Sequence, residues 1–361
     1  MPGSDPGMAA EDVSGARPRT RPNGTRPSRP ARRSRSARSP PSIVGAVQHV
    51  AHWDDVEGRR REAGHIAGTW FDLGRAAGTV GAGLKRIQID PGKWSTPAHI
   101  EGAEEEIFFV LGGSGVSWQD DGRGGVAYEV GEGDCLVHLA EAEAHTLCAG
   151  PDGLDVLAFG QRLAHGNTVL PRSRVAWMWP AFVDVVPIGD DHPYKREAAA
   201  GEPDVGELME RPQTIVNLHD VEIVEREHGS SRFLEEDLGR KAGSLHTGIS
   251  RVTIPAGREG WPPHCHSAEE EIFVVLDGSG TLVLGDAEHP VRRGHVVGRP
   301  PGTRVAHSFR AGQADLTYLA YGTREPNDIA YYPRSNKVSL RGVGVMARLE
   351  QIDYWDGEPS R

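Results

Sequence analysis

The chain is poor in several features that define common classes of protein. It has only three cysteines in 361 residues, which excludes a disulfide-stabilised scaffold and a four-cysteine zinc site. No run approaches the roughly 18 consecutive apolar residues that a membrane-spanning helix needs. No glycine-rich phosphate-binding motif follows an expected strand. With 37% hydrophobic and 25% charged residues, the composition is that of a globular protein of about two domains.

The charge is distributed unevenly along the chain. Residues 1–42 contain nine arginines, no lysine and three acidic residues, whereas the whole chain has a formal net charge of −11. This Pro-, Ser- and Gly-rich tail has too few apolar residues to form a core, so we expect it to be disordered. An arm that binds a polyanion, or an organelle transit peptide, is the functional alternative. The acidic remainder argues against nucleic acid as the main partner, and we expect a cytoplasmic protein without membrane attachment.

Two long segments of the chain repeat one another. Residues 83–115 align with residues 248–280 without a gap, and residues 154–162 align with residues 316–324. Both copies contain the run EEEIF followed by a Gly-Ser-Gly segment. Two copies of one unit explain this most simply. We therefore divide the chain into a tail (1–42), a first domain (43–190), a linker (191–212), a second domain (213–350) and a C-terminal tail (351–361).

Short runs rich in β-branched and aromatic residues recur within each copy. Examples are RIQID, EIFFVL and DVLAF in the first copy, and EIFVVL and TYLAYG in the second. Gly-rich segments such as GGSG and DGSG separate them. Strands at such regular spacing predict an antiparallel sandwich or barrel, and no sustained helical period competes with this interpretation.

The second copy carries a group of residues of the types that bind metals. His264 and His266 are two positions apart, so on a strand they point to the same face. Glu271 directly precedes the next apolar run, which makes it a better ligand candidate than Glu270, and His307 lies at the end of another expected strand. Three imidazoles and one carboxylate suit a divalent transition metal with open coordination positions, namely Fe, Mn, Ni, Co, Cu or Zn.

The pattern His-x-His, four residues and Glu, followed by a Gly…Pro-Pro-Gly…His segment, resembles the cupin superfamily. Four residues separate Gly302 from His307 where the family usually has two, and the usual terminal Asn is absent. With two copies, the chain resembles a bicupin over most of residues 43–350. The resemblance implies an all-β fold of two tandem double-stranded β-helix, or jelly-roll, barrels. It also implies that the four ligand candidates of the second copy form a metal site.

The first copy departs further from this pattern. His99 aligns with His264, but Glu101 stands where the second histidine would be. Glu106 and His145 keep the other two positions. These residues would bind a second metal through two histidines and two carboxylates, or else the first barrel serves packing and dimerisation alone.

Cupin-like proteins include dioxygenases, decarboxylases, isomerases and storage proteins, so the resemblance alone does not select one activity. We expect an Fe(II)-type dioxygenase or related oxidoreductase that acts on a small oxygenated or carboxylated molecule in the second barrel. A Mn-dependent decarboxylase or isomerase, and a non-catalytic metal- or small-molecule-binding protein, are the alternatives. Trp261 and Arg324 are candidate substrate contacts. Glu104 and Glu269 are expected at a solvated strand edge, and the chain is expected to form a homodimer.

Overall fold

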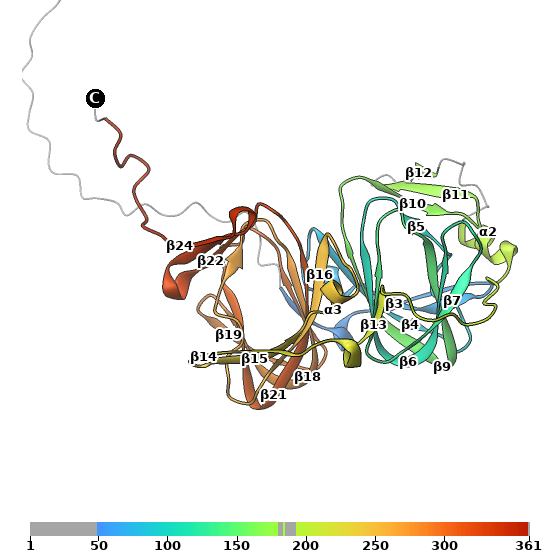
Figure 1. Ribbon diagram of the computed structural model, residues 1–361, viewed down its shortest axis with the longest axis horizontal. Coiled ribbons are helices and arrows are strands. Elements are labelled where there is room, and N and C mark those ends of the chain that lie inside the picture. The colour runs from blue at the N-terminus through green and yellow to red at the C-terminus, as the bar shows by residue number, and fades with distance from the viewer. Residues whose placement is uncertain (1–48, 180–182, 185–192, 360–361) are drawn as a thin grey trace, which may run out of the picture. The chain divides into compact units, whose positions relative to one another are not determined.

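The computed structural model describes residues 49–179, 183–184 and 193–359. The tail at 1–42, for which we predict disorder, lies outside the described residues. Nearly all described secondary structure is β-strand, and Figure 1 shows it folded into two barrels. The structure confirms the predicted all-β fold with two tandem barrels, and both barrels belong to one compact unit. None of the described helices is long and apolar enough to cross a membrane.

Barrel 1 is built mainly from the first repeat. Its large sheet has the strand order β13-β8-β6-β9-β4-β3-β2, with β7 paired to β6. These strands are β2 (Arg59–Ala63), β3 (Ile66–Phe71), β4 (Ala82–Ile89), β6 (Glu106–Asp120), β7 (Val126–Gly131), β8 (Asp134–His138), β9 (Ala144–Gln161) and β13 (Ile215–Asn217). A smaller sheet contains β5 (Ile100–Glu101), β10 (Gly166–Leu170), β11 (Val175–Trp179) and β12 (Val183–Asp184). The short helices of this half are η1 (Trp53–Asp55), α1 (Leu73–Ala76) and α2 (Pro193–Ala200).

Barrel 2 repeats this plan with the second copy. Its large sheet has the order β1-β20-β18-β21-β16-β15-β14, with β19 paired to β18. These strands are β1 (Val50–His52), β14 (Val224–His228), β15 (Ser231–Glu236), β16 (Thr247–Ile254), β18 (Glu271–Leu284), β19 (Ala287–Arg292), β20 (His295–Arg299) and β21 (His307–Thr323). Its smaller sheet contains β17 (Cys265–His266), β22 (Ile329–Tyr332), β23 (Lys337–Leu340) and β24 (Val345–Arg348). The helical turns are η2 (Leu218–Asp220), α3 (Leu238–Lys241), η3 (Pro333–Ser335) and η4 (Arg341–Val343).

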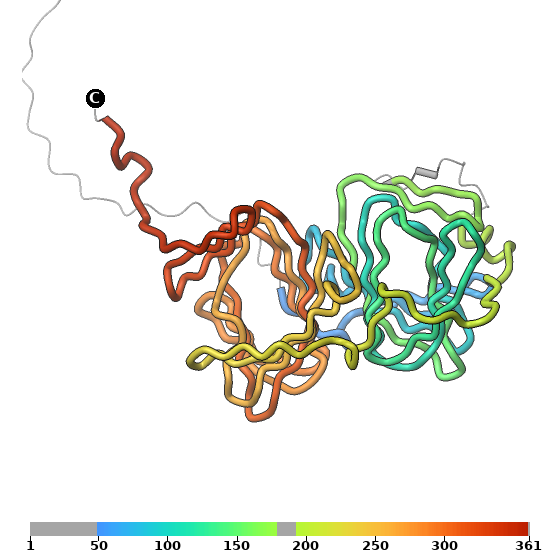
Figure 2. The backbone as a smooth tube through the Cα atoms, in the orientation of Figure 1, coloured from blue at the N-terminus to red at the C-terminus, as the bar shows by residue number. Residues whose placement is uncertain are grey.

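Each repeat contributes its first strand to the other barrel. Strand β1 precedes barrel 1 in the chain but pairs with β20 of barrel 2, with Val50 opposite Val297. Strand β13 precedes barrel 2 but pairs with β8 of barrel 1, with Val216 opposite Cys135. Figure 2 shows the yellow part of the chain leaving barrel 1 and crossing to barrel 2. This exchange ties the two barrels together through backbone hydrogen bonds.

The repeated Gly-Ser-Gly run lies inside a strand rather than between two strands. In β18 the pairing register with β21 shifts on either side of Gly278. Gly278 has a φ of +73°, and a Cβ atom there would lie 1.8 Å from the carbonyl oxygen of Asp315. Gly113 of β6 repeats this with a φ of +83° and a distance of 2.3 Å to the carbonyl of Gly153. Only glycine fits such a bulge, and the bulge bends the long strand around the barrel.

The apolar side chains form three clusters. One fills barrel 1 and a second fills barrel 2. The third combines buried residues of both halves, including Leu84 and Phe159 of barrel 1 with Ile249 and Tyr321 of barrel 2. Phe159 and Tyr321 stack across this contact with ring centroids 5.0 Å apart. Because each barrel alone would leave this apolar face in water, we infer that the two fold as one unit.

The middle glutamate of each EEE run reaches into the opposite barrel. The Glu105 carboxylate, which is fully buried, accepts hydrogen bonds from the Ser244 hydroxyl (2.6 Å) and from the backbone N–H of Leu245 (2.7 Å). The Glu270 carboxylate in turn accepts the backbone N–H groups of Val80 (2.8 Å) and Ala82 (2.7 Å). These two reciprocal contacts, which we call the glutamate clasps, give each buried carboxylate its hydrogen-bond donors and hold a loop of one barrel against the other.

We expect Glu105→Gln to destabilise the protein by about 2–3 kcal/mol, because the amide NH₂ group would face donors that need an acceptor. Burial raises the pKa of Glu105, but the hydrogen bonds from Ser244, Thr247 and the backbone outweigh it, so its pKa is lowered overall. Such a group contributes stability above its unfolded pKa and loses it as the pH falls. The stability difference between wild type and variant, measured by urea unfolding, should therefore shrink from about pH 6 to pH 3. The exposed Glu57→Gln is the control; equal effects at both positions would contradict the clasp.

Candidate metal centre

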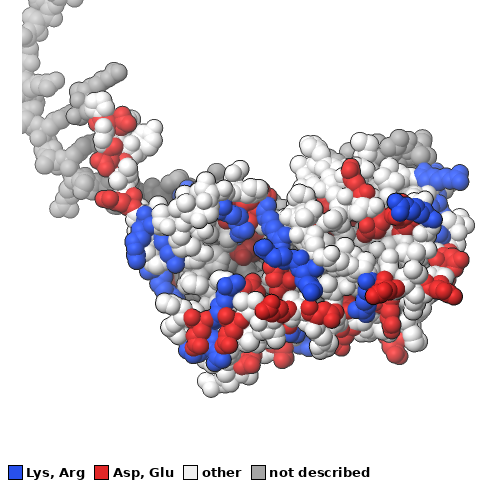
Figure 3. All heavy atoms as spheres, viewed as in Figure 1, with Lys and Arg blue, Asp and Glu red and all other residues white. Residues whose placement is uncertain are grey.

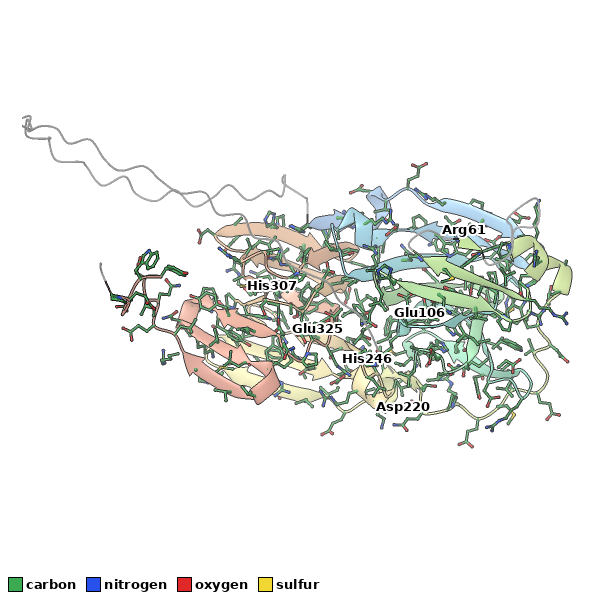
Figure 4. The ribbon with its side chains drawn as sticks, turned by 90° about the horizontal axis from the view of Figure 1, so that it is seen from above. Arg61, Glu106, Asp220, His246, His307 and Glu325 are labelled. Atoms are coloured by element: carbon green, nitrogen blue, oxygen red, sulfur yellow. The ribbon has the colours of Figure 1, made fainter. Side chains whose placement is uncertain are left out.

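The strands of barrel 2 place the four ligand candidates on one inner wall. His264 forms an isolated bridge with His307, in which each backbone N–H donates to the other's carbonyl (3.2 and 2.8 Å). His266 belongs to β17, and Glu271 is the first residue of β18. Figure 4 shows the labelled His307 within barrel 2. His264 and His307, which are 43 positions apart in the chain, therefore share one site through this bridge.

The side-chain atoms of this group converge. Ligand atoms of His264, His266 and Glu271 all lie within 4.8 Å of one another. Glu271 Oε2 lies 3.4 Å from His266 Nε2 and 3.0 Å from His307 Nε2. The structure thus brings together all four candidates of the second copy.

Two of the three imidazoles are oriented by acceptors on their outer side. His264 Nδ1 lies 2.8 Å from the carbonyl oxygen of Pro262, and His266 Nδ1 lies 2.7 Å from Asp328 Oδ2. An acceptor at Nδ1 fixes the proton there and leaves the Nε2 lone pair free. Both lone pairs then face Glu271, which is the orientation that metal ligands require.

Buried polar atoms without hydrogen-bond partners lie at the centre of this group. His266 Nε2, Glu271 Oε2 and His307 Nε2 are all buried and make no hydrogen bond with good geometry. Buried polar atoms in native proteins are nearly always satisfied. A divalent cation at this point would satisfy all three, so the residues present fit a metal with a three-histidine, one-glutamate ligand set.

The electrostatics of the group favour a neutral His264 and an ionised Glu271. Burial, together with the neighbouring His307, lowers the pKa of His264 to about 4. Burial raises the pKa of Glu271, but the surrounding histidines outweigh it and hold the pKa well below its usual range. Neutral imidazole and ionised carboxylate are the forms that bind metal, and His264 and Glu271 have these forms at neutral pH. The pKa of His266 is raised instead, because the carboxylates of Asp328 and Glu271 outweigh its burial.

A cavity of about 560 Å³ opens over the four residues. Aromatic side chains form much of its wall. Among the described lining residues, Arg341 is the only lysine or arginine. Arg341 is paired with Glu269 at 2.5 Å. The residues of the smaller sheet that line it are Ala330, Tyr332, Ser339, Val345 and Met346. This sheet therefore covers the mouth of the barrel.

The two candidate substrate contacts lie in different places. Trp261 lines the cavity, where its ring packs against Phe233 at 4.3 Å and the Arg226 guanidinium lies 5.6 Å from the ring centre. Arg324 is not among the cavity residues, because its guanidinium donates to the carbonyl oxygen of Ser244 (2.5 Å). Arg162 of the first copy holds the carbonyl of Thr79 in the same way (2.8 Å). The structure therefore places Arg324 against the loop of Ser244, whose hydroxyl donates to Glu105 of barrel 1, and does not bring it to the cavity.

Barrel 1 holds a different version of the same group. His99 and His145 form the corresponding bridge, and their Nε2 atoms lie 3.2 and 3.1 Å from Glu106 Oε2. Glu101 lies 3.7 Å from His99, and its carboxylate accepts a hydrogen bond from the Thr168 hydroxyl (2.9 Å). In barrel 1 the central atoms therefore satisfy one another by hydrogen bonds, which the atoms of barrel 2 do not.

A third carboxylate joins the barrel 1 group. Oxygen atoms of Glu101, Glu104 and Glu106 lie within 4.8 Å of one another. Burial and the neighbouring carboxylates raise the pKa of Glu104 to about 9 and that of Glu101 to about 7. Three acidic groups at such distances cannot all ionise without a cation. The expectation of a solvated edge is wrong for Glu269, which is buried at 4% exposure, and Glu104 is half-buried.

The sequence interpretation did not connect three residues with the two groups that they contact. Asp328 binds His266, and the buried Arg299 lies opposite Glu271 in the β18–β20 pairing. His138 takes the place of Arg299 in barrel 1, where its ring stacks on that of His145 with centroids 3.8 Å apart. A signal for Asp328 was present in the repeat, because its counterpart is Gly166, and His266 has likewise been replaced in the first copy.

The comparisons agree with this architecture. Residues 250–320 match the family described as the cupin domain. The oxalate decarboxylase of Bacillus subtilis at pH 4.6 is similar with a TM-score of 0.52 and 16% identity over 77% of this chain and 78% of that chain. A Bacillus subtilis oxalate decarboxylase structure whose Mn(II) centres were studied gives a TM-score of 0.52, 15% identity, and the same coverage of 77% and 78%. The Lactobacillus farciminis oxalate decarboxylase formate complex gives 0.53 and 14% over 78% of this chain and 87% of that chain. No curated protein sequence matches significantly.

The fold and the site define a double-barrel β protein with a candidate metal centre in its second barrel. Residues 250–320 match the cupin domain family, and the two-barrel fold of the chain is similar to that of the oxalate decarboxylases. At identities of 14–16% the structural similarity establishes the fold and leaves the reaction open.

Proposed function

We propose that this bicupin is a metal-dependent enzyme whose second barrel holds one divalent transition metal through His264, His266, Glu271 and His307. The observation that carries the proposal is the group of buried, unpartnered nitrogen and oxygen atoms at the base of the cavity. Such a set leaves coordination positions open for an oxygen-bearing substrate. A metal bound there supplies Lewis-acid activation of that substrate and, as Fe(II), electron transfer to dioxygen.

The chain's own residues define how a substrate would bind. Trp261 and Tyr332 line the cavity wall, and Tyr332 stacks on His264 with centroids 5.4 Å apart. A cavity of about 560 Å³ is in the range of sites for drug-sized molecules. The smaller sheet forms one side of it. These features favour a planar or largely apolar molecule that presents two oxygen atoms to the centre.

We favour an Fe(II)-type dioxygenase or related oxidoreductase over other activities. The one Arg among the lining residues is paired with Glu269, so the described wall offers no unpaired guanidinium or ammonium to a small dianion. A two-carbon dicarboxylate would also leave most of the cavity unfilled. An oxygenated ring with hydroxyl or carbonyl groups suits both the size and the charge.

A Mn-dependent decarboxylase or isomerase is the second candidate. The structural neighbours are oxalate decarboxylases, one of them studied through its Mn(II) centres, and this favours the alternative.

Acidic and basic side chains are interspersed on the face that Figure 3 shows. A homodimer and a cytoplasmic location remain parts of the proposal.

The test begins with metal content and continues with substrates. Protein without a tag should contain about one equivalent of Fe or Mn in barrel 2, and anaerobic reconstitution with each metal should precede a screen of oxygenated aromatic and carboxylic compounds. Oxygen uptake would support the dioxygenase, and carbon dioxide release without oxygen uptake would support the decarboxylase. Protein that binds no metal after reconstitution would contradict both and leave a binding protein without turnover.

We expect Trp261→Ala to raise KM about tenfold with little change in kcat, because the ring contributes cavity wall but no ligand atom. Trp355→Ala, at a ring that is 70% exposed, is the matched control and should leave KM unchanged. Steady-state kinetics on the substrate found in the screen measure both. A lowered kcat with unchanged KM would contradict this role for Trp261.

A further inference from the structure

The buried carboxylate of Asp328 has two separate sets of hydrogen-bond partners. One oxygen, Oδ2, lies 2.7 Å from His266 Nδ1. The other, Oδ1, accepts the backbone N–H groups of Ser267 (3.1 Å), Ala268 (2.9 Å) and Glu269 (3.2 Å). Asp328 is 1% exposed, so water does not replace these partners. Three N–H donors on one oxygen hold the carboxylate in a single orientation.

We propose that Asp328 is a positioning residue that sets the tautomer of His266, so that the Nε2 lone pair of His266 faces the metal. The inference rests on the proposed metal site of barrel 2. Because a carboxylate only accepts, His266 must donate its Nδ1–H to Oδ2. In the neutral ring the lone pair is then on Nε2, which lies 3.4 Å from Glu271 Oε2.

In barrel 1 the histidine and the aspartate that orients it are both absent. Where His266 is replaced by Glu101, the counterpart of Asp328 is Gly166, which has no side chain to orient a ring. Thr168, the strand neighbour of Glu101, donates to that carboxylate instead. In barrel 2 the corresponding neighbour of His266 is Ala330, which can make no such bond. The partner of each side chain thus changes together with the side chain.

Asp328 also connects the site to the sheet that covers the cavity. It directly precedes β22, which pairs with β17 and places Ala330 opposite His266. The Asp328 carbonyl accepts the backbone N–H of Arg341 (3.1 Å), at the far end of β23. The orientation of His266 and the placement of the covering sheet therefore depend on the same residue.

The tautomer itself can be read in the metal-free protein. With ¹⁵N-labelled histidine and at a pH at which the ring is neutral, the signals of His266, identified by their loss in His266→Ala, should show the single proton on Nδ1. A neutral ring with its proton on Nε2 in the wild-type protein would overturn the proposal without any variant. This reading does not depend on metal binding, so it stays distinct from a failure of the proposed function, which metal content reports.

The variant Asp328→Asn separates positioning from a merely structural role. The three backbone N–H donors require an oxygen, so the amide NH₂ of Asn would face His266 Nδ1 and force the proton to Nε2. We expect the affinity for Mn²⁺, measured by competition with a chelator, to fall about 100-fold. In Asp328→Ala the ring of His266 can adopt either tautomer, so the affinity for Mn²⁺ should fall only about tenfold. This variant should nevertheless lose more thermal stability than Asp328→Asn.

The order of the two variants decides the outcome. The proposal is supported if Asp328→Asn binds Mn²⁺ more weakly than Asp328→Ala does, while the metal-free Asp328→Asn protein is at least as stable as the metal-free Asp328→Ala protein. Equal losses of affinity that follow apo-protein stability would overturn it. Ser267→Ala, which removes one hydroxyl donor to Oδ1 at 3.3 Å but leaves the bond to His266, is the control and should bind Mn²⁺ within about twofold of wild type.

Discussion

Replacement of His264 by Ala is expected to lower the metal affinity of barrel 2 by at least about 100-fold and to abolish turnover. Loss of an outer hydrogen-bond partner of a metal ligand already costs 10–100-fold, and His264 contributes the ligand atom itself. Its Nε2 is one of the few nitrogens available, because Pro262 holds Nδ1. His266→Ala should behave in the same way. Elemental mass spectrometry on the variants beside wild type measures the loss.

The control for this prediction is His228→Ala, an exposed histidine on β14. It should retain the wild-type metal content. His99→Ala in barrel 1 should remove at most one of two equivalents. Unchanged metal content in His264→Ala, with the protein folded, would show that the four residues of barrel 2 do not form the site.

Removal of the metal is expected to lower the free energy of unfolding by about 4 kcal/mol at a free metal concentration near 1,000 times Kd. The reason is mass action, because the converging ligands exist only in the folded chain. Thermal unfolding with and without chelator measures the shift. His264→Ala should respond little to chelator if barrel 2 holds the only metal.

The chelator-induced stability shift that remains in His264→Ala depends on whether barrel 1 also binds a metal. Its group has two histidines, Glu106 and two further carboxylates, which suits a harder cation than the set of barrel 2. If it binds a second metal, His264→Ala would keep part of the chelator-induced shift, and Glu106→Gln would remove that part. A full shift in His264→Ala would contradict the assignment of the main site to barrel 2.

Much of the fold was accessible from the sequence because it depends on local patterns. The two copies have matching β-runs, and each copy folds into the same two sheets. The pair His264 and His266 was recognisable because strand residues two apart share a face. Glu271 and His307 followed from their positions at strand ends. What these side chains bind remains a prediction.

Other features could not be read from local patterns. Asp328 is 62 positions from His266 in the chain, and although the repeat shows that both residues are replaced in the first copy, only the fold shows that they are in contact. Glu105 and Glu270 belong to runs of three identical residues, and only the packing of one barrel on the other shows which carboxylate crosses. Arg324 was a candidate for the cavity because arginine binds carboxylates well, but the Ser244 carbonyl takes its guanidinium.

The sequence by itself determined the class of protein: a duplicated β-unit with a nearly complete set of metal-ligand residues in its second copy and an altered set in its first. These properties are encoded in residue type and spacing, which can be read without knowledge of the fold. Only the tertiary structure decided which strands the barrels exchange, which glutamates face the histidines and which face a loop, and how His266 is oriented. Each of these depends on hydrogen bonds between segments far apart in the chain, and a buried donor or acceptor takes whichever partner the packing brings to it.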